Sequence, residues 1–187
     1  NADRAKAQAA FADYGQYLDS LEMTATIKGF EPLYIQRIAQ LTNKSNQFNL
    51  TTLRCSEDDI RAMAGDKNDL CLCGKLVDKF GDNGIVTVVA GRQQGDVLDL
   101  TLWLMSCRVL KRGMEDAMMD TVVAEAAARG VKTIVGHYYP TAKNAMVREF
   151  YAQYDFAKTA EDADGNTEWT LDVAAYTPKH PHMKIER

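Results

Sequence analysis

The residues 107–114, CRVLKRGM, have the composition of an anion-binding turn. They follow an apolar stretch with strand character and precede a long helical pattern. The first backbone amides of a helix have no partners within the helix, and the helix dipole adds positive potential, so a phosphate or pyrophosphate fits there. A solvated basic turn closed by a helix cap accounts for the same residues equally well. The candidate anion-binding residues are Arg108, Val109, Lys111, Arg112, Gly113 and Met114.

Cys107 places a thiol immediately before this turn. A helix N-terminus and the neighbouring Arg108 both favour the thiolate, which is the nucleophilic form of cysteine. Such a thiolate can hold an acyl or glyceryl unit as a thioester. Free cysteines are also among the most frequently buried residues, so a structural role in the core is the alternative.

Two further groups of polar residues are candidate substrate contacts. Asn46, Gln47 and Asn49 form a dense amide cluster, which can bind substrate hydroxyls or cap local backbone groups. Asp82 and Asn83 lie in a turn between two predicted strands, where turn formation by itself explains both residue types.

A mixed α/β fold has to position these side chains. Predicted strands cover residues 23–28, 70–76, 85–90, 97–106, 131–135, 156–158 and 168–172. Predicted helices cover residues 2–20, 32–41, 56–63, 113–129 and 141–154. In the strand from residue 97, leucines alternate regularly with Asp99, Thr101 and Trp103. The adjacent hairpins predict a sheet that is partly antiparallel and flanked by helices.

The bulk composition limits the possible partners. The 187 residues carry a net charge of −4 and a pI of about 5.4, which argues against a general affinity for nucleic acid or anionic membranes. No apolar run approaches the roughly 20 residues of a membrane span. The four cysteines form no CxxC pair, so a disulfide framework and a zinc site are not expected, and a cytoplasmic location fits. No metal site is predicted.

Three segments are expected along the chain. Residues 1–22 are Ala-rich and are predicted to form a connecting helix, residues 23–177 to form the main domain, and residues 178–187 to form an irregular tail.

The turn at residues 108–113 resembles the acyl-CoA loop of the GNAT acyltransferase superfamily, Arg/Gln-x-x-Gly-x-Gly/Ala. That resemblance implies a GNAT-like fold and loop amides that bind the pyrophosphate of coenzyme A. Lys111 stands where the motif has its first glycine. Because a lysine adopts a positive φ only at an energetic cost, the loop is expected to be reshaped.

A second stretch, NAMVREFYAQYDF at residues 144–156, is similar to the GNAT motif Asn-x-x-Ala-x-x-x-Tyr-x-x-x-Gly-Phe. The resemblance implies that Asn144 contacts the pantetheine and that Tyr151 protonates the leaving thiolate. A core aromatic is the alternative role for Tyr151. In a GNAT sheet two adjacent strands splay to admit the pantetheine, which makes His137 a candidate base, with a hydrogen-bonded structural side chain as the alternative.

Longer strings resemble the carboxy-terminal part of FkbH-like proteins of the haloacid dehalogenase superfamily. They are SLEM (20–23), FEPLYIQRIAQLTNKSNQFNLTT (30–52), DKFGDNGIV (78–86), LMSCRVLKRGMED (104–116) and YPTAKN (139–144). In that family a phosphatase-like haloacid dehalogenase-type domain precedes this part. Relatives load a glyceryl unit from a phosphorylated three-carbon precursor onto an acyl carrier protein for polyketide assembly.

Three functions remain open from the sequence. The first is a GNAT-like acyl or glyceryl transferase acting on the phosphopantetheine thioester of an acyl carrier protein or of CoA. The second is a non-catalytic module that docks a carrier protein for the phosphatase-like domain. The third is an ordinary acetyl-CoA-dependent N-acetyltransferase.

Overall fold

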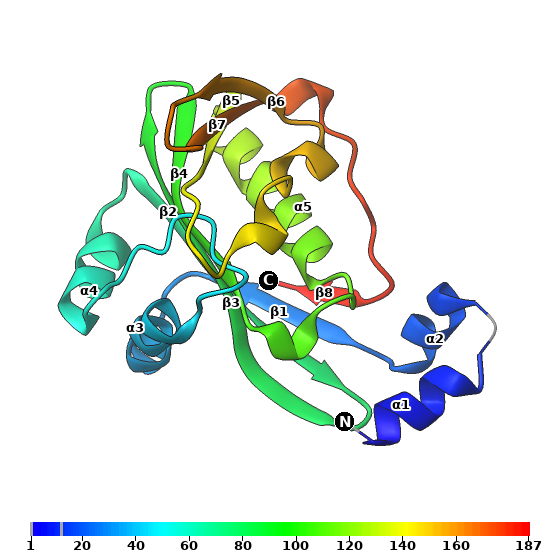
Figure 1. Ribbon diagram of the computed structural model, residues 1–187. Coiled ribbons are helices and arrows are strands. Elements are labelled where there is room, and N and C mark those ends of the chain that lie inside the picture. The colour runs from blue at the N-terminus through cyan, green and yellow to red at the C-terminus, as the bar shows by residue number, and fades with distance from the viewer. Residues whose placement is uncertain (1, 12) are drawn as a thin grey trace.

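A single mixed sheet forms the centre of the molecule (Figure 1). The computed structural model describes residues 2–11 and 13–187. The strands are β1 (Thr24–Lys28), β2 (Asp69–Asp78), β3 (Gly81–Gln94), β4 (Val97–Met105), β5 (Thr133–Tyr138), β6 (Ala157–Glu161), β7 (Thr167–Asp172) and β8 (Lys184–Glu186). They lie in the order β6-β7-β5-β4-β3-β2-β1-β8. The pairs β4–β5 and β1–β8 are parallel and all other neighbours are antiparallel, which confirms the predicted mixed sheet.

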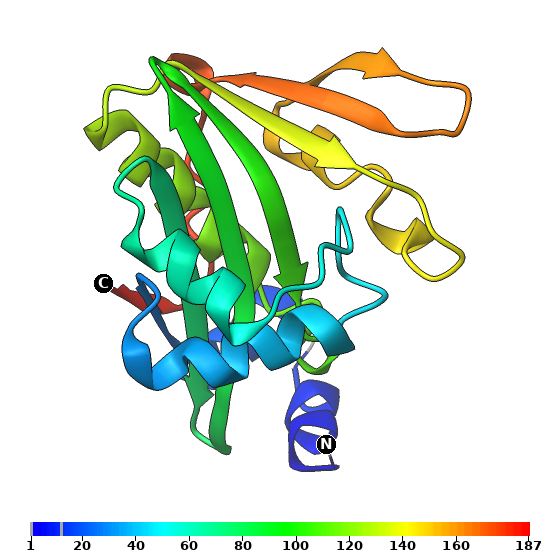
Figure 2. The ribbon, with the colours of Figure 1, turned by 90° about the vertical axis from the view of Figure 1, so that its left-hand side faces the viewer.

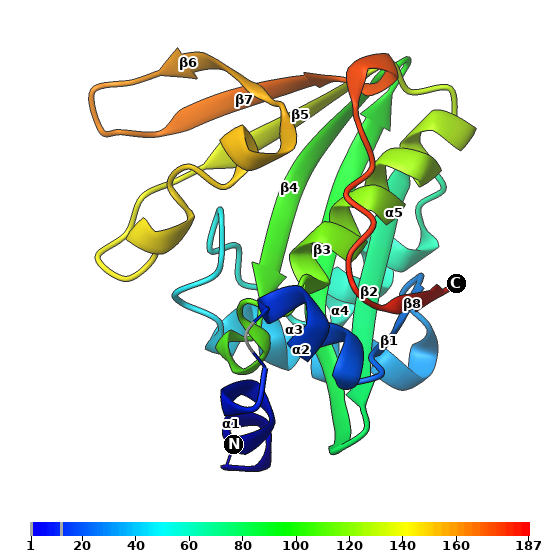
Figure 3. The ribbon, with the colours of Figure 1, turned by 90° about the vertical axis from the view of Figure 1, so that its right-hand side faces the viewer.

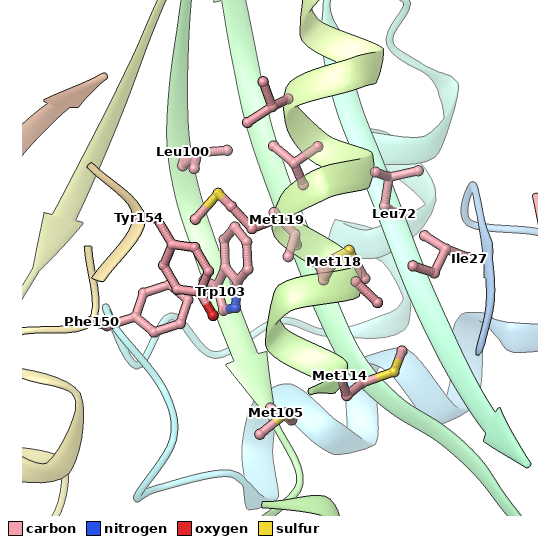
Figure 4. Packing of buried hydrophobic residues seen from close by; sticks show 14 of the residues in the cluster. Ile27, Leu72, Leu100, Trp103, Met105, Met114, Met118, Met119, Phe150 and Tyr154 are labelled. Carbon is pink, nitrogen blue, oxygen red and sulfur yellow. The ribbon is translucent and has the colours of Figure 1, made fainter. Parts of the chain in front are cut away.

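Helices cover both faces of the sheet. They are α1 (Ala2–Ala9), α2 (Tyr14–Ser20), α3 (Ile35–Lys44), α4 (Glu57–Gly65) and α5 (Met114–Ala128). Helix α5 lies on one face, whereas α3 and α4 cover the other (Figure 1). On the α5 face, Met118 and Met119 pack in one apolar cluster with Trp103 (Figure 4). The opposite cluster joins α3 to the other side of β3 and β4.

Two helix ends follow directly from local sequence. Ser56 and Asp59 form the predicted capping box at the start of α4, with each side chain accepting the other residue's backbone N–H. Helix α5 is followed by Gly130 at a φ of 77°, a left-handed conformation that costs glycine least. The predicted helix 113–129 is therefore confirmed within a residue at each end.

A β-bulge interrupts the regular alternation predicted for β4. Ala90 on β3 pairs with Leu102 and Gly91 pairs with Leu100, so Thr101 is the extra residue. Before the bulge, Leu100 packs on the α5 face. After it, Leu102 packs on the α3 face and Trp103 returns to the α5 face. Large apolar side chains on both sides of β4 are needed because helices cover both faces.

Both ends of the chain differ from the expectation. The single helix predicted for residues 2–20 is two helices, and the second begins at Tyr14 after the N-cap Asp13, whose side chain accepts the Gly15 N–H. The tail, expected to be irregular, contributes strand β8, which pairs with β1 through Lys184 opposite Thr24. The pairing partner of β8 is distant in sequence, so no local pattern indicates it.

The helix predicted for residues 141–154 is wrong. Two 3₁₀ turns take its place, η3 (Ala145–Val147) and η4 (Tyr151–Tyr154). The Asn144 side chain accepts the Thr141 N–H, and Asp155 ends the segment at a φ of 69°. Side-chain bonds to the backbone and the packing of the aromatic residues therefore outweigh the local helical pattern.

We expect Gly136→Ala to destabilise the fold. A Cβ at Gly136 of β5 would lie 2.5 Å from the Tyr151 ring, and the aromatic cluster leaves that ring no room to move. The free energy of unfolding should fall by about 1–3 kcal/mol, as for other overpacked cores, measured by urea denaturation. Gly65→Ala at the end of α4 is the matched control, because nothing lies within 4 Å of its added Cβ. Equal stability of the two variants would contradict this account of the packing.

Candidate functional site

The sheet splits between β4 and β5, and a segment of the chain fills the split. The two strands pair only from Val97 to Asp99 of β4 and then diverge (Figure 2). The segment 48–52 lies between them. The Leu50 N–H donates to the Trp103 carbonyl at 3.0 Å, and the Leu50 carbonyl accepts the Tyr139 N–H at 2.9 Å. The gap in which the sequence resemblance places a pantetheine is occupied by the protein's own backbone.

Asn144 fixes this inserted segment. Its amide nitrogen donates to the carbonyls of Asn49 and Tyr139, at 3.0 Å and 2.9 Å. Its oxygen accepts the Thr141 N–H and the Tyr138 hydroxyl. Asn144 and Asn49 are fully buried. The predicted contact of Asn144 with a pantetheine stays a prediction, while its present bonds hold the inserted segment to the end of β5 and the residues after it.

Tyr151 lies inside the core. Its side chain is 1% exposed, and burial, with a smaller contribution from the charge of Asp99, raises its pKa far above the ordinary value. The ring packs against Gly136 and edge-to-face against Trp103. This arrangement fits the structural alternative, and its role as an acid stays a prediction.

The basic turn before α5 has an unusual backbone. Residues Cys107–Val109 form a 3₁₀ turn, and Ser106 accepts the Arg108 N–H. Lys111 adopts a φ of 63° and Gly113 a φ of 88°, so the lysine itself takes a left-handed conformation of the kind that glycine adopts at least cost. The expected reshaping of the loop is therefore not needed at Lys111. Successive N–H groups around left-handed residues form concave anion sites.

Other parts of the chain surround this turn. The Tyr14 hydroxyl donates to the Lys111 carbonyl, and a Cβ on Gly113 would lie 3.1 Å from Pro181 of the tail. Glu115 brings a carboxyl group to the first turn of α5; burial raises its pKa, and Oε2 has no hydrogen-bond partner within the described residues. Negative charge at the helix start competes with a bound phosphate for the same dipole.

Arg112 faces a carboxylate rather than solvent. It donates to Asp78 at 3.0 Å, and Arg4 of α1 forms two bonds to the same carboxylate, at 2.7 and 2.9 Å. The Asp78 side chain is fully buried. Burial would raise its pKa, but hydrogen bonds from Arg4 and the Phe80 N–H, together with the two arginine charges, hold that pKa below its ordinary value. Arg112 is therefore engaged in the scaffold of the turn.

Cys107 is exposed, so the buried structural alternative is wrong. Its Sγ lies 3.2 Å from the Oε1 of Gln47. The thiol lines a cavity of about 530 Å³ together with Asn46 and Gln47. The sequence analysis missed three cations that line this cavity, because they come from α3 and from the segment after β5: Arg37, Lys44 and Lys143.

The remaining candidates lie in two other places. The His137 Nε2 lies 2.5 Å from an Asp99 oxygen, which is the hydrogen-bonded arrangement of the structural alternative. Asp82 forms an ion pair with Lys75 at 2.8 Å. Asn83 accepts a hydrogen bond from Arg108 through its carbonyl, and both line a second cavity, of about 480 Å³, with Asp82.

Known structures share this architecture. The chain resembles the ribosomal-protein-S18-alanine N-acetyltransferase from Escherichia coli, with a TM-score of 0.60 at 15% identity over 80% of this chain and 94% of that one. The GNAT domain of S. lividans PAT matches with a TM-score of 0.60 at 15% identity over 78% and 89%. The spermidine N-acetyltransferase from Vibrio cholerae in complex with CoA and spermine gives a TM-score of 0.60 at 9% identity over 80% and 96%.

The chain has the GNAT fold. No family model and no curated protein sequence matches it. The prediction of a GNAT-like mixed sheet flanked by helices is confirmed. At these identities the likeness shows the fold alone, so the site has to carry the functional argument.

Among residues 2–11 and 13–187, no group of three or more His, Cys, Asp and Glu side chains could hold a metal ion. No helix in these same ranges has the length and apolar character to cross a bilayer.

We expect Asp78→Asn to weaken the fold most at neutral pH. The substitution leaves Arg4 and Arg112 without their buried carboxylate, which should cost about 3 kcal/mol of unfolding free energy. Because the pKa of Asp78 is lowered, its stabilisation is present above the ordinary Asp range and is lost as pH falls through the lowered pKa. Urea unfolding at pH 7 and pH 3 should show the difference from wild type shrinking in acid. Asp58→Asn, at an exposed carboxylate of α4, is the control and should change little.

Proposed function

We propose that this chain is a GNAT-like acyl or glyceryl transferase domain of an FkbH-like protein. It acts on the phosphopantetheine thioester of an acyl carrier protein or of CoA. The observation that carries the proposal is the exposed Cys107 thiol at the end of β4, lining a cavity large enough for an acyl unit and part of a pantetheine. The amides of Asn46 and Gln47 lie in the same cavity and can accept and donate hydrogen bonds to glyceryl hydroxyls.

The chemistry requires two acyl transfers at one sulfur. The Cys107 thiol loses its proton, and its sulfur attacks the carbonyl carbon of an acyl phosphate or thioester. A new C–S bond forms, the bond from that carbon to the leaving phosphate or thiolate breaks, and the leaving group takes up the proton. In the second transfer the thiol of a holo carrier attacks the Cys107 thioester. The acyl unit moves to the carrier sulfur, and Cys107 regains a proton.

The inserted segment 48–52 determines from which side a pantetheine reaches the thiol. The split between β4 and β5 is occupied, so the arm approaches Cys107 along the cavity beside α3. The carrier protein and a haloacid dehalogenase-type domain are the partners of this function.

A second function is favoured by the same segment. The split in the sheet is filled and Tyr151 is buried, so neither is open to a substrate. Both features suit a non-catalytic module that docks the carrier while the phosphatase-like domain performs the chemistry. Such a module needs no nucleophile, so the behaviour of Cys107 distinguishes the two functions.

We expect Cys107→Ala to abolish acyl transfer. The chain, alone and together with the haloacid dehalogenase-type domain, is incubated with a phosphorylated three-carbon donor and a holo carrier protein, and intact masses are measured. The wild type should show a glyceryl adduct that passes to the carrier. The variant should show no adduct and load the carrier at least about 100-fold more slowly, as expected on loss of a nucleophile.

Cys71→Ala is the matched control, because Cys71 is a half-buried thiol on β2 away from the cavity. It should leave the adduct and the loading rate unchanged. Equal loading by wild type and Cys107→Ala would overturn the nucleophile and favour the docking module. Tight binding of acetyl-CoA without any loading of the carrier would favour the N-acetyltransferase.

A further inference from the structure

The cavity beside Cys107 is surrounded by uncompensated positive charge. Arg37, Lys44 and Lys143 line it together with the thiol, and none of the described residues that line it is acidic. In the part of the chain that the structure describes, no ion pair involves any of these three cations. Other cations among the described residues also lack an ion pair, so what distinguishes these three is that they line one cavity together with a thiol.

Two further arginines add positive charge near the same cavity. The acceptors of Arg54 among the described residues are all neutral, including the Ser45 carbonyl at 2.9 Å. Arg54 lines an adjoining cavity that shares Asn46 and Lys143 with the first. Arg108 donates to the Asn83 carbonyl and the Ser106 hydroxyl, and to no carboxylate within residues 2–11 and 13–187. Burial, followed by the charge of Arg108, lowers the pKa of Arg37, as expected where positive charges face one another without a counter-ion.

We infer that this cavity is a binding site for a phosphate ester next to the Cys107 thiol. Resting on the proposed function, the inference names the substrate class of that site: a ligand whose phosphate lies among Arg37, Lys44 and Lys143. The geometry suits such a ligand because Cys107, Asn46 and Gln47 offer a thiol and two amides on the same cavity wall. Arginine and lysine side chains are the usual partners of phosphate oxygens.

Two sources can supply this phosphate. One is the phosphate of the phosphopantetheine arm, and the other is the phosphate of a small phosphorylated acyl donor. With its phosphate bound among Arg37, Lys44 and Lys143, the arm brings its thiol or thioester to Cys107, and the donor brings its acyl group there. The cavity volume of about 530 Å³ accommodates either one.

The test measures the electrostatic potential in the cavity through the reactivity of the Cys107 thiol, and it does not depend on acyl transfer. Purified protein is alkylated with iodoacetate, which is anionic, and with iodoacetamide, which is neutral, and the modification of Cys107 is followed by peptide mass. The other thiols react slowly, because burial raises the pKa of Cys71 and of Cys73 to about 12 and also raises that of Cys55. The ratio of the two rates measures the local potential at Cys107.

We expect each of Arg37→Gln, Lys44→Gln and Lys143→Gln to lower the iodoacetate-to-iodoacetamide ratio about twofold at low salt, and the triple variant about five- to tenfold. Lys132→Gln is the matched control. It removes one charge from an exposed residue just before β5, at the opposite end of that strand from Lys143, and should leave the ratio unchanged. An unchanged ratio in the triple variant, or an equal change in the control, would overturn the site.

Protection by ligands then identifies the source. At constant ionic strength, inorganic phosphate should slow the alkylation by iodoacetamide relative to chloride in the wild type and have no effect in the triple variant. Pantetheine 4′-phosphate protecting at lower concentration than pantetheine assigns the arm, whereas a phosphorylated three-carbon acid protecting better than its dephosphorylated form assigns the donor. Protection by neither, or only by an intact acidic carrier protein, would overturn the inference. Phosphate protection without any acyl adduct would retain the site and reject the transferase.

Discussion

The hydrogen bonds that hold residues 48–52 between β4 and β5 are the constraint on which the rest of the structure depends. They satisfy strand edges that the split sheet would otherwise leave buried and unpaired, a cost of several kcal/mol for this many groups. Asn144 links this segment to the chain after β5, and the same segment begins beside the cavity wall that carries Asn46 and Gln47. The hydrogen bonds that fill the split in the sheet therefore also fix the start of the segment next to the amides of Asn46 and Gln47, beside the thiol.

Short sequence patterns correctly predicted the elements whose ends are fixed by residues close together in the chain. The capping box at Ser56 and the glycine after α5 set helix ends within a residue or two, and the mixed sheet followed from the hairpins. The expectations that failed at β8 and at β4 concern pairing between distant strands, whereas those for residues 2–20 and 141–154 failed at local side-chain caps. At the β4 bulge, Gly91 lies so close to the opposite strand that an added Cβ would be 2.8 Å from the Asp99 carbonyl oxygen. Sequence alternation alone cannot indicate such an approach.

The candidate site shows the same division. The turn before α5 and the position of Cys107 were readable from one contiguous stretch of sequence, even though Lys111 departs from the glycine pattern. The cavity itself is built from three distant segments, so Arg37 and Lys143 gave no spacing that could mark them. Asn144 and Tyr151, which the motif resemblance selects, are engaged in the interior of this molecule. The spacing of the motifs therefore predicted where along the chain the site lies, but it did not predict which side chains line the cavity.

One carboxylate has a mechanical consequence. Helix α1 extends away from the sheet (Figure 3), yet its Arg4 shares Asp78 with Arg112, which also donates to the carbonyl of Arg108 in the turn beside the thiol. A displacement of α1 would leave a fully buried negative charge with less compensation, and Arg112 would have to readjust toward it. The Asp78 carboxylate therefore ties the position of α1 to that of Arg112, and through Arg112 to the turn beside Cys107.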